Sequence, residues 1–150
     1  MENISKDIIV GELGSGKTTL IREKIIPTIK NFVVFDFCDE YRLHVKDYNT
    51  VRYFNGLTGW PLKEAVIKSI AELNDDTTII IDNAQLLYFP KNKYSFIPDR
   101  GFEWLIESLK NRKHILVFQN MKQFVGNGIT GYYNLMFMEN FKLVPIKNNY

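Results

Sequence analysis

Residues 11–18 read Gly-Glu-Leu-Gly-Ser-Gly-Lys-Thr, and this stretch decides the fold of the 150-residue chain. It matches the pattern G-x-x-x-x-G-K-[ST] in full, which is typical of a loop that wraps phosphate groups. Apolar residues 7–10 before it favour a buried strand, and residues 19–25 after it favour a helix. In that setting backbone N–H groups converge at the start of the helix, where an anion binds well. The competing interpretation is a glycine-rich turn that only packs tightly.

The residues of this loop have separate expected tasks. The glycines permit backbone turns that a Cβ atom resists. Lys17 is expected to contact the β- and γ-phosphates of a nucleotide, and the Thr18 hydroxyl is expected to bind Mg²⁺. The predicted nucleotide-binding set is Gly11, Glu12, Leu13, Gly14, Ser15, Gly16, Lys17, Thr18 and Thr19. The sequence therefore predicts a site for ATP or ADP together with Mg²⁺.

Length and composition favour one globular domain spanning residues 1–150. Hydrophobic residues make up 45% of the chain and charged residues 24%, which is ordinary for such a domain. The chain has no apolar run of about eighteen residues and no basic-then-apolar N-terminal segment, so we expect no membrane span, no signal peptide and a cytoplasmic location. Cys38, the single cysteine, is expected to be a half-buried structural thiol. A net charge of +2 is too small to indicate a nucleic-acid partner by itself.

Apolar runs alternate with helical patterns along the chain. We expect strands at about 7–10, 32–37, 50–54, 77–82, 114–119 and 134–138, with 141–146 as a further edge strand. Helical patterns run from Lys17 to near Pro27, follow Pro61, and cover residues 102–109. Continuous β-branched runs, such as 77–81, are typical of strands covered on both faces. The pattern predicts a three-layer α/β/α fold with a mostly parallel central sheet.

A carboxylate follows one of the predicted buried strands. Asp82 comes directly after Ile79-Ile80-Ile81, where a nucleotide site needs a group that holds Mg²⁺ directly or through water. Capping of the next helix is the alternative role, and the two are compatible. Asn83 stands next, and its amide can hold a water molecule but cannot accept its proton. The candidate bases are therefore Glu12 and Glu40; alternatively hydrolysis is slow, or Asn83 positions water while the γ-phosphate takes the proton.

Gln119 closes the predicted strand at 114–119, where an apolar residue would be less costly to bury. Sensing the γ-phosphate is a natural use for such a residue. With Arg112 and Lys113 upstream, the segment 102–119 resembles the helix, arginine and strand-to-glutamine arrangement of the HerA–FtsK superfamily, DNA-pumping ATPases that include viral genome-packaging motors. Residues 31–41 are similar to the strand, aspartate and Glu-Tyr element of that family. Residues 82–87 resemble its Walker B stretch without the usual glutamate.

The resemblance spans most of residues 7–120 and implies a P-loop NTPase of the additional-strand class, with a RecA-like fold. It also implies a homo-oligomeric ring, a hexamer in this family, that translocates or packages DNA. In such rings an arginine reaches the adjacent subunit's site, and Arg112 matches that position best, with Arg100 second. A solvated cation at the end of a helix is the competing interpretation of Arg112.

Two irregular stretches, residues 89–98 and 121–131, are expected either to contact DNA or a neighbouring subunit or simply to connect elements. The leading hypothesis is an ATP-hydrolysing motor with DNA as its partner. One alternative is a small-molecule kinase of the nucleoside type, although the cysteine zinc site usual there is missing. The other is a nucleotide-binding switch or accessory ATPase with little turnover. Released phosphate, a nucleoside phosphate product and binding without turnover distinguish the three.

Overall fold

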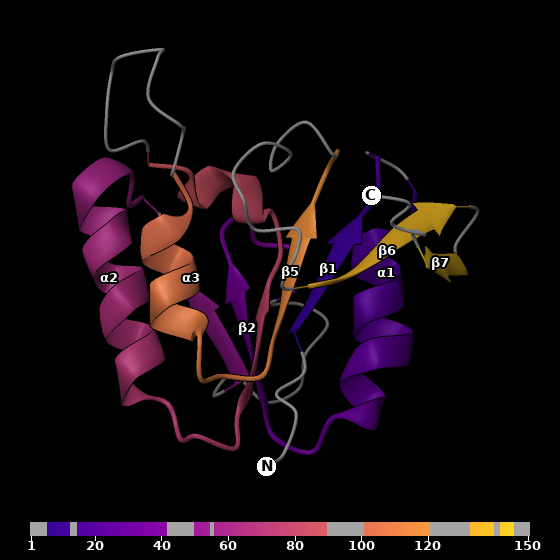
Figure 1. The fold of residues 1–150 in the computed structure, drawn as a ribbon, viewed down its shortest axis with the longest axis horizontal. Coiled ribbons are helices and arrows are strands. Elements are labelled where there is room, and N and C mark those ends of the chain that lie inside the picture. The colour runs from indigo at the N-terminus through magenta and orange to yellow at the C-terminus, as the bar shows by residue number, and fades with distance from the viewer. Residues whose placement is uncertain are drawn as a thin grey trace.

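The computed structural model describes residues 6–12, 15–41, 50–54, 56–89, 101–120, 133–139 and 142–145. They form a central sheet of seven strands in the order β3-β2-β4-β5-β1-β6-β7. The strands are β1 (Lys6–Val10), β2 (Phe32–Asp36), β3 (Val51–Tyr53), β4 (Thr78–Ile81), β5 (His114–Phe118), β6 (Asn134–Glu139) and β7 (Lys142–Pro145). All neighbours pair in parallel except β7, which runs antiparallel to β6. Figure 1 shows the resulting twisted sheet.

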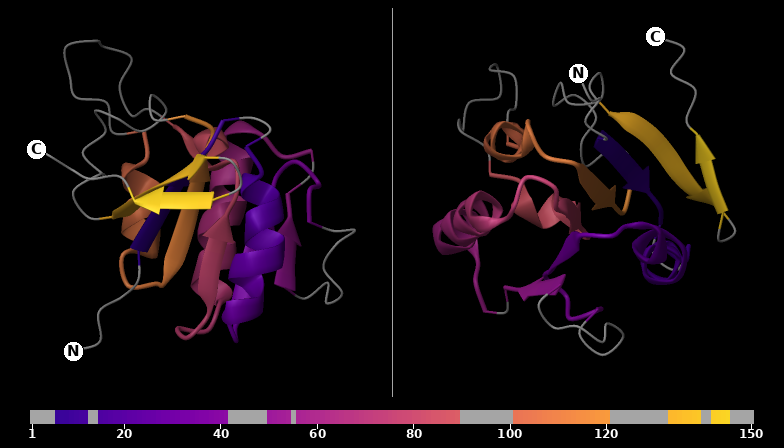
Figure 2. Two further views of the ribbon diagram at one scale, coloured as in Figure 1. Left: turned by 90° about the vertical axis from the view of Figure 1, so that its right-hand side faces the viewer. Right: turned by 90° about the horizontal axis from the view of Figure 1, so that it is seen from below.

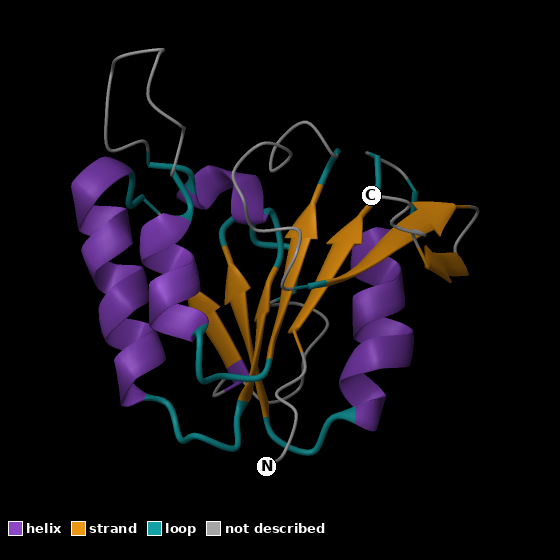
Figure 3. Ribbon diagram, viewed as in Figure 1, coloured by secondary structure: helices purple, strands orange, loops and turns teal. Residues whose placement is uncertain are grey.

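Helices cover both faces of the sheet. On one face lie α2 (Gly59–Glu72) and α3 (Glu103–Leu109), side by side, and on the other lies α1 (Lys17–Leu20) (Figure 1). The side and bottom views in Figure 2 give the same three layers, and Figure 3 shows them by type of secondary structure. The predicted α/β/α fold is therefore confirmed. No helix in the described part of the chain is long and apolar enough to cross a membrane.

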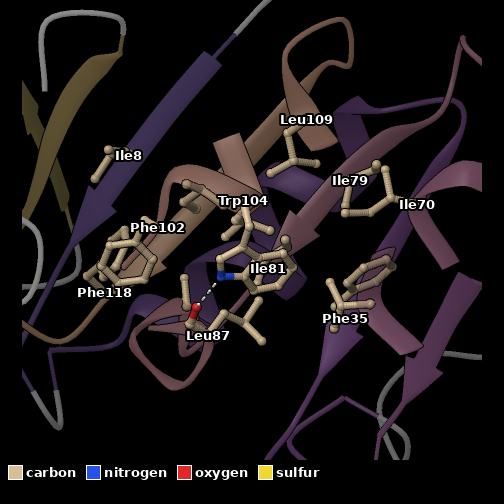
Figure 4. Close-up of a cluster of buried hydrophobic side chains, with 14 of the residues drawn as sticks. Ile8, Phe35, Ile70, Ile79, Ile81, Leu87, Phe102, Trp104, Leu109 and Phe118 are labelled. Carbon is tan, nitrogen blue, oxygen red and sulfur yellow. Dashed lines mark hydrogen bonds between the residues drawn. The ribbon is translucent and has the colours of Figure 1, made fainter. Parts of the chain in front are cut away.

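The strand runs are continuous because alternate side chains fill two separate cores. Ile79 and Ile81 of β4 pack toward α2 and α3, whereas Ile80 between them packs toward Ile21 on the helix after the phosphate loop. Figure 4 shows the larger core, where the Trp104 indole N–H donates to the Leu87 carbonyl at 3.1 Å. With both faces buried, each of the three positions Ile79, Ile80 and Ile81 requires an apolar side chain.

The predicted strands agree with the structure to within one residue at each end. The helix after the phosphate loop is the element that differs. It begins as α1 but continues as a π-helix at Ile21–Ile25 and a 3₁₀ turn at Ile26–Thr28. Pro27 lies in that last turn, as expected for a residue that cannot donate a helical N–H bond. The periodicity of apolar residues alone does not reveal the change in helix type.

Candidate nucleotide and metal site

The candidate site lies where the parallel strands end. The phosphate loop follows β1, Asp36 ends β2, Asp82 follows β4 and Gln119 follows β5. The register sets Val10 opposite Phe118 and Ile81 opposite Leu116, and the Gly11 N–H donates to the Phe118 carbonyl at 3.0 Å. In the sheet, β5 lies between β1, which leads into the phosphate loop, and β4, which leads to Asp82. This is the additional strand that the family resemblance implied. Open α/β sheets bind ligands at this edge.

The described part of the phosphate loop requires glycine at two positions. Gly16 has φ 88°, a left-handed conformation that favours glycine. A Cβ atom on Gly11 would lie 2.5 Å from Ser15 Oγ and 2.8 Å from Met138 Cβ, closer than such contacts occur. Ser15 Oγ is buried and has no hydrogen-bond partner among the described residues, and Lys17 is only 7% exposed. Leu13 and Gly14 lie outside the described residues.

The Thr18 hydroxyl lies between two carboxylates from different strands. Thr18 Oγ1 is 2.9 Å from Glu40 Oε2 and 2.9 Å from Asp82 Oδ2. A hydroxyl has one hydrogen to donate, so it can satisfy only one carboxylate at a time. The structure thus brings together Thr18, Glu40 and Asp82, which are far apart in the sequence. Of the two candidate bases, Glu40 contacts Thr18, whereas Glu12 is exposed.

Asp82 is held from three sides. Its carboxylate is 1% exposed, Oδ1 accepts the Asn83 N–H at 2.9 Å, and Oδ2 accepts the Tyr41 hydroxyl at 2.7 Å in addition to facing Thr18. Burial of Tyr41, together with the nearby Asp82 and Glu40 charges, raises the pKa of this phenol far above its ordinary range. Tyr41 therefore stays a hydrogen-bond donor at every physiological pH.

The turn that carries Glu40 and Tyr41 is built around a second buried carboxylate. Asp36, 1% exposed at the end of β2, accepts the backbone N–H groups of Cys38 (3.3 Å) and Glu40 (3.1 Å) on Oδ1 and that of Tyr41 (3.1 Å) on Oδ2. Such side-chain to backbone bonds stabilise tight turns. This role of Asp36 was not expected from the sequence, where the available signal was an aspartate at a strand end followed by polar residues. Cys38 is exposed on this turn, so the prediction of a half-buried thiol is wrong.

The residue after Asp82 is held in an unusual conformation. Asn83 has φ 56°, in the left-handed region that asparagine tolerates better than most residues, and it begins the 3₁₀ helix Ala84–Leu87. Its side-chain oxygen lies 3.4 Å from Gln85 Nε2. Asn83, and not Asp82, occupies the N-cap position of this helix, and its side chain makes no capping hydrogen bond there.

The donor set fits a magnesium–nucleotide complex. Mg²⁺ prefers oxygen ligands and is usually held by one or two carboxylates, water and the phosphates of a substrate. Thr18 and Asp82 supply such oxygens beside the phosphate loop, with Glu40 at the same distance from Thr18. Within the described ranges there is no group of three or more His, Cys, Asp or Glu side chains that could hold a metal.

The structure does not bring Arg112 to this site. Arg112 precedes β5 and so lies at the opposite edge of the sheet, and at about 3.3 Å per residue the length of β5 separates it from the phosphate loop by roughly 15 Å. Its Nη1 donates to the Leu73 carbonyl at the end of α2 (2.7 Å) and lies 3.5 Å from Asp75 Oδ1; the side chain is 13% exposed. Arg112 is therefore not a solvated cation, and within its own chain it ties α3 and β5 to the end of α2.

The other predicted residues divide in two groups. Gln119 is partly buried at the end of β5, next to the phosphate loop, and Thr19 lies in α1. Residues 90–100, with Arg100, and 121–132 lie outside the described residues, so most of the expected DNA-contacting stretches 89–98 and 121–131 are not described.

Comparison with solved structures agrees with this geometry. The genome packaging NTPase B204 from Sulfolobus turreted icosahedral virus 2, in complex with ATP-gammaS, has 19% sequence identity and a TM-score of 0.54, with 91% of this chain and 75% of that chain covered. Its complex with AMPPCP gives 20% identity and a TM-score of 0.51 over 81% of this chain and 67% of that chain. The fold is that of a P-loop NTPase. No protein-family model and no curated protein matches the chain.

At an identity of about 20% the similarity concerns the fold alone. The resemblance to packaging ATPases that was predicted from the sequence is therefore confirmed for the fold. The complex of B204 with sulfate matches in the same way, with 20% identity and a TM-score of 0.53 over 90% of this chain and 74% of that chain.

Proposed function

We propose that this chain binds ATP with Mg²⁺ at the carboxyl edge of its sheet and hydrolyses it. The observation that carries this proposal is the Thr18 hydroxyl placed 2.9 Å from both Glu40 and Asp82, directly after a complete phosphate-loop sequence. Two carboxylates that share one hydroxyl hydrogen leave negative charge unbalanced. A divalent cation next to Thr18 would balance it.

Each described residue has a task in this proposal. Lys17, buried at the start of α1, supplies positive charge to the β- and γ-phosphates. Thr18 and Asp82 would hold Mg²⁺, which supplies charge neutralisation at the phosphates when it is bound. Ser15 Oγ, which has no partner among the described residues, is available to a phosphate oxygen. Gln119 is proposed to sense the γ-phosphate from the end of β5.

Glu40 is the proposed general base. It replaces the carboxylate that is absent at Asn83, and the turn held by Asp36 brings it to the site from β2. A carboxylate can take the proton of an attacking water, whereas the Asn83 amide cannot. Asn83, fixed by its backbone conformation and by Gln85, is proposed to position that water.

The proposal extends to a DNA-packaging or DNA-translocating motor that works as a homo-oligomeric ring. The similar fold of the genome packaging NTPase B204 supports this extension. In a ring, Arg112 is proposed to act on the site of an adjacent subunit, because the sheet separates it from the site of its own. Basic and aromatic side chains in 89–98 and 121–131 are proposed to contact DNA phosphates and bases without a sequence code.

One experiment tests the proposal directly. Phosphate release from ATP is measured with and without double-stranded DNA, together with the particle mass by light scattering in each condition. The motor proposal predicts Mg²⁺-dependent phosphate release, a ring-sized particle with ATP, and stimulation by DNA. A nucleoside phosphate product would instead identify a kinase, and binding without release would identify a switch protein.

A further inference from the structure

The Tyr41 side chain has two parts in very different surroundings. The residue is fully buried and packs in the core cluster on the α1 side of the sheet, with Ile21, Val34 and Ile80. Its hydroxyl leaves that core and donates to Asp82 Oδ2 at 2.7 Å. A phenylalanine would fill the same apolar space without a polar group to satisfy. The hydroxyl therefore has a use at Asp82 and not in the core.

Asp82 needs this donor most when Thr18 serves another partner. In the structure Oδ2 faces both Thr18 and Tyr41, and Oδ1 accepts the Asn83 N–H. If the Thr18 oxygen becomes a metal ligand, the two remaining donors must keep the carboxylate in place. Hydrogen-bond partners behind a metal ligand commonly change metal affinity or activity by about 10- to 100-fold when removed.

We propose that Tyr41 is a positioning residue that holds Asp82 in its metal-binding orientation, and that Asp36 sets this arrangement by fixing the turn after β2. The inference rests on the proposed Mg²⁺–nucleotide site. Asp36 accepts the N–H groups of both Glu40 and Tyr41, so one buried carboxylate places the proposed base and the Asp82 donor together. The turn after β2 and the end of β4 thus act as one unit.

The test compares two hydrogen-bonded tyrosine hydroxyls, one at each end of the strands. Tyr41→Phe removes the hydroxyl that Asp82 accepts, and Tyr133→Phe removes a hydroxyl bonded to His114 at 2.8 Å at the other edge of the sheet. Binding of a non-hydrolysable ATP analogue is titrated by calorimetry in Mg²⁺ and again in EDTA, and melting temperatures are recorded. Tyr41→Phe should bind the analogue in EDTA with the same affinity as the unaltered protein. The increase in affinity that Mg²⁺ provides should be about tenfold smaller in this variant. Tyr133→Phe should match the unaltered protein in both buffers.

Each result decides the inference. Full Mg²⁺ tightening in Tyr41→Phe overturns it, and so does an equal loss of affinity in both buffers, which would indicate a structural role alone. If Tyr41→Phe does not fold, Asp36→Asn is measured in the same way. An amide has one acceptor oxygen where the carboxylate has two, so either the Tyr41 N–H or the N–H groups of Cys38 and Glu40 lose their acceptor. Undiminished Mg²⁺ tightening in that variant overturns the inference. If the unaltered protein binds no analogue in either buffer, the proposed function itself fails, and this inference with it.

Discussion

The two edges of the central sheet bury polar groups in opposite ways. Where β5 begins, both ring nitrogens of His114 have a hydrogen-bond partner. Nδ1 donates to the Arg112 carbonyl at 2.7 Å, because a carbonyl can only accept, and Nε2 accepts the Tyr133 hydroxyl at 2.8 Å. Where the strands end, one Thr18 hydrogen faces two carboxylates. A matched set stabilises the fold by itself, whereas an unmatched set is completed by a ligand.

This contrast predicts how substitutions divide. Changes at the edge where the strands end should alter binding or turnover with little effect on stability. Changes at the edge where they begin should alter stability or its pH dependence with little effect on binding. Arg112 is the one residue of that second edge for which we predict an additional role.

Lys17→Ala has the largest expected effect on nucleotide binding. Removal of the charge that is proposed to contact the phosphates should weaken binding of an ATP analogue by at least about a hundredfold, equivalent to roughly 3 kcal/mol. The melting temperature should stay close to that of the unaltered protein. Lys24→Ala, an exposed lysine on the same helix, is the matched control. Undiminished affinity in Lys17→Ala would refute the phosphate-loop assignment.

Arg112→Ala tests whether a residue at the edge where the strands begin affects stability alone or turnover as well. Loss of the bond to the Leu73 carbonyl should lower the free energy of unfolding by about 1–3 kcal/mol, measured by urea titration. In the proposed ring it should also lower phosphate release on the order of a thousandfold, with nucleotide affinity unchanged. Lys110→Ala is the control, since Lys110 pairs only at the surface with Glu107.

Mixing the Arg112→Ala and Lys17→Ala proteins separates the two effects of Arg112. Mixed rings contain interfaces that join an intact phosphate loop to an intact Arg112, and these rings should regain part of the phosphate release. Such recovery would indicate that Arg112 acts at the nucleotide site of the adjacent subunit. Absence of recovery in preparations shown to co-assemble would leave Arg112 with its structural role alone.

Glu40→Ala and Asn83→Ala sharpen the assignment within the site. Removal of the proposed base should lower the rate of phosphate release by about a hundredfold or more. Removal of the Asn83 amide should have a smaller effect, because that group only positions water. Single-turnover rates with saturating ATP give the ranking. The opposite order would assign the larger part of water activation to Asn83.

The last prediction concerns the pH dependence of stability. Burial lowers the pKa of His114 from 6.5 to about 4, more than the Arg112 carbonyl raises it. Between these pH values the unfolded chain binds a proton at His114 that the folded chain does not. The contribution of His114 to the free energy of unfolding is therefore fully present above pH 6.5 and is lost as the pH drops toward 4. The loss should reach about 2–3 kcal/mol near pH 4.5. Urea titrations at several pH values, repeated on His114→Gln, should show a weaker pH dependence in the variant; an equal dependence would exclude His114 as its cause.

Elements with a strong local pattern could be predicted from the sequence. The seven strands, the phosphate loop and Asp82 follow from apolar runs and from residues at fixed spacing. The fold class follows from the alternation of strands with helices. These features are set by neighbours along the chain, so a single sequence contains them.

The missed features depend on residues that meet only in the folded chain. Nothing local to Tyr41 shows that its hydroxyl meets Asp82, and nothing local to Arg112 shows that it reaches Leu73. Lys17 gave no sign of being buried, because a loop residue is normally exposed. Glu40 was one of two candidate bases, and it lies beside Thr18 because β2 and β4 are adjacent.

The exposed turn after β2 contains a site for a spectroscopic label. Cys38 is the only cysteine of the chain, and its side chain is exposed while its backbone N–H is held by Asp36. A fluorescent or spin label can therefore be attached there without removing any other thiol. Its emission or line shape would report the motion of the turn that carries Glu40 and Tyr41, in real time, as nucleotide is added and turned over.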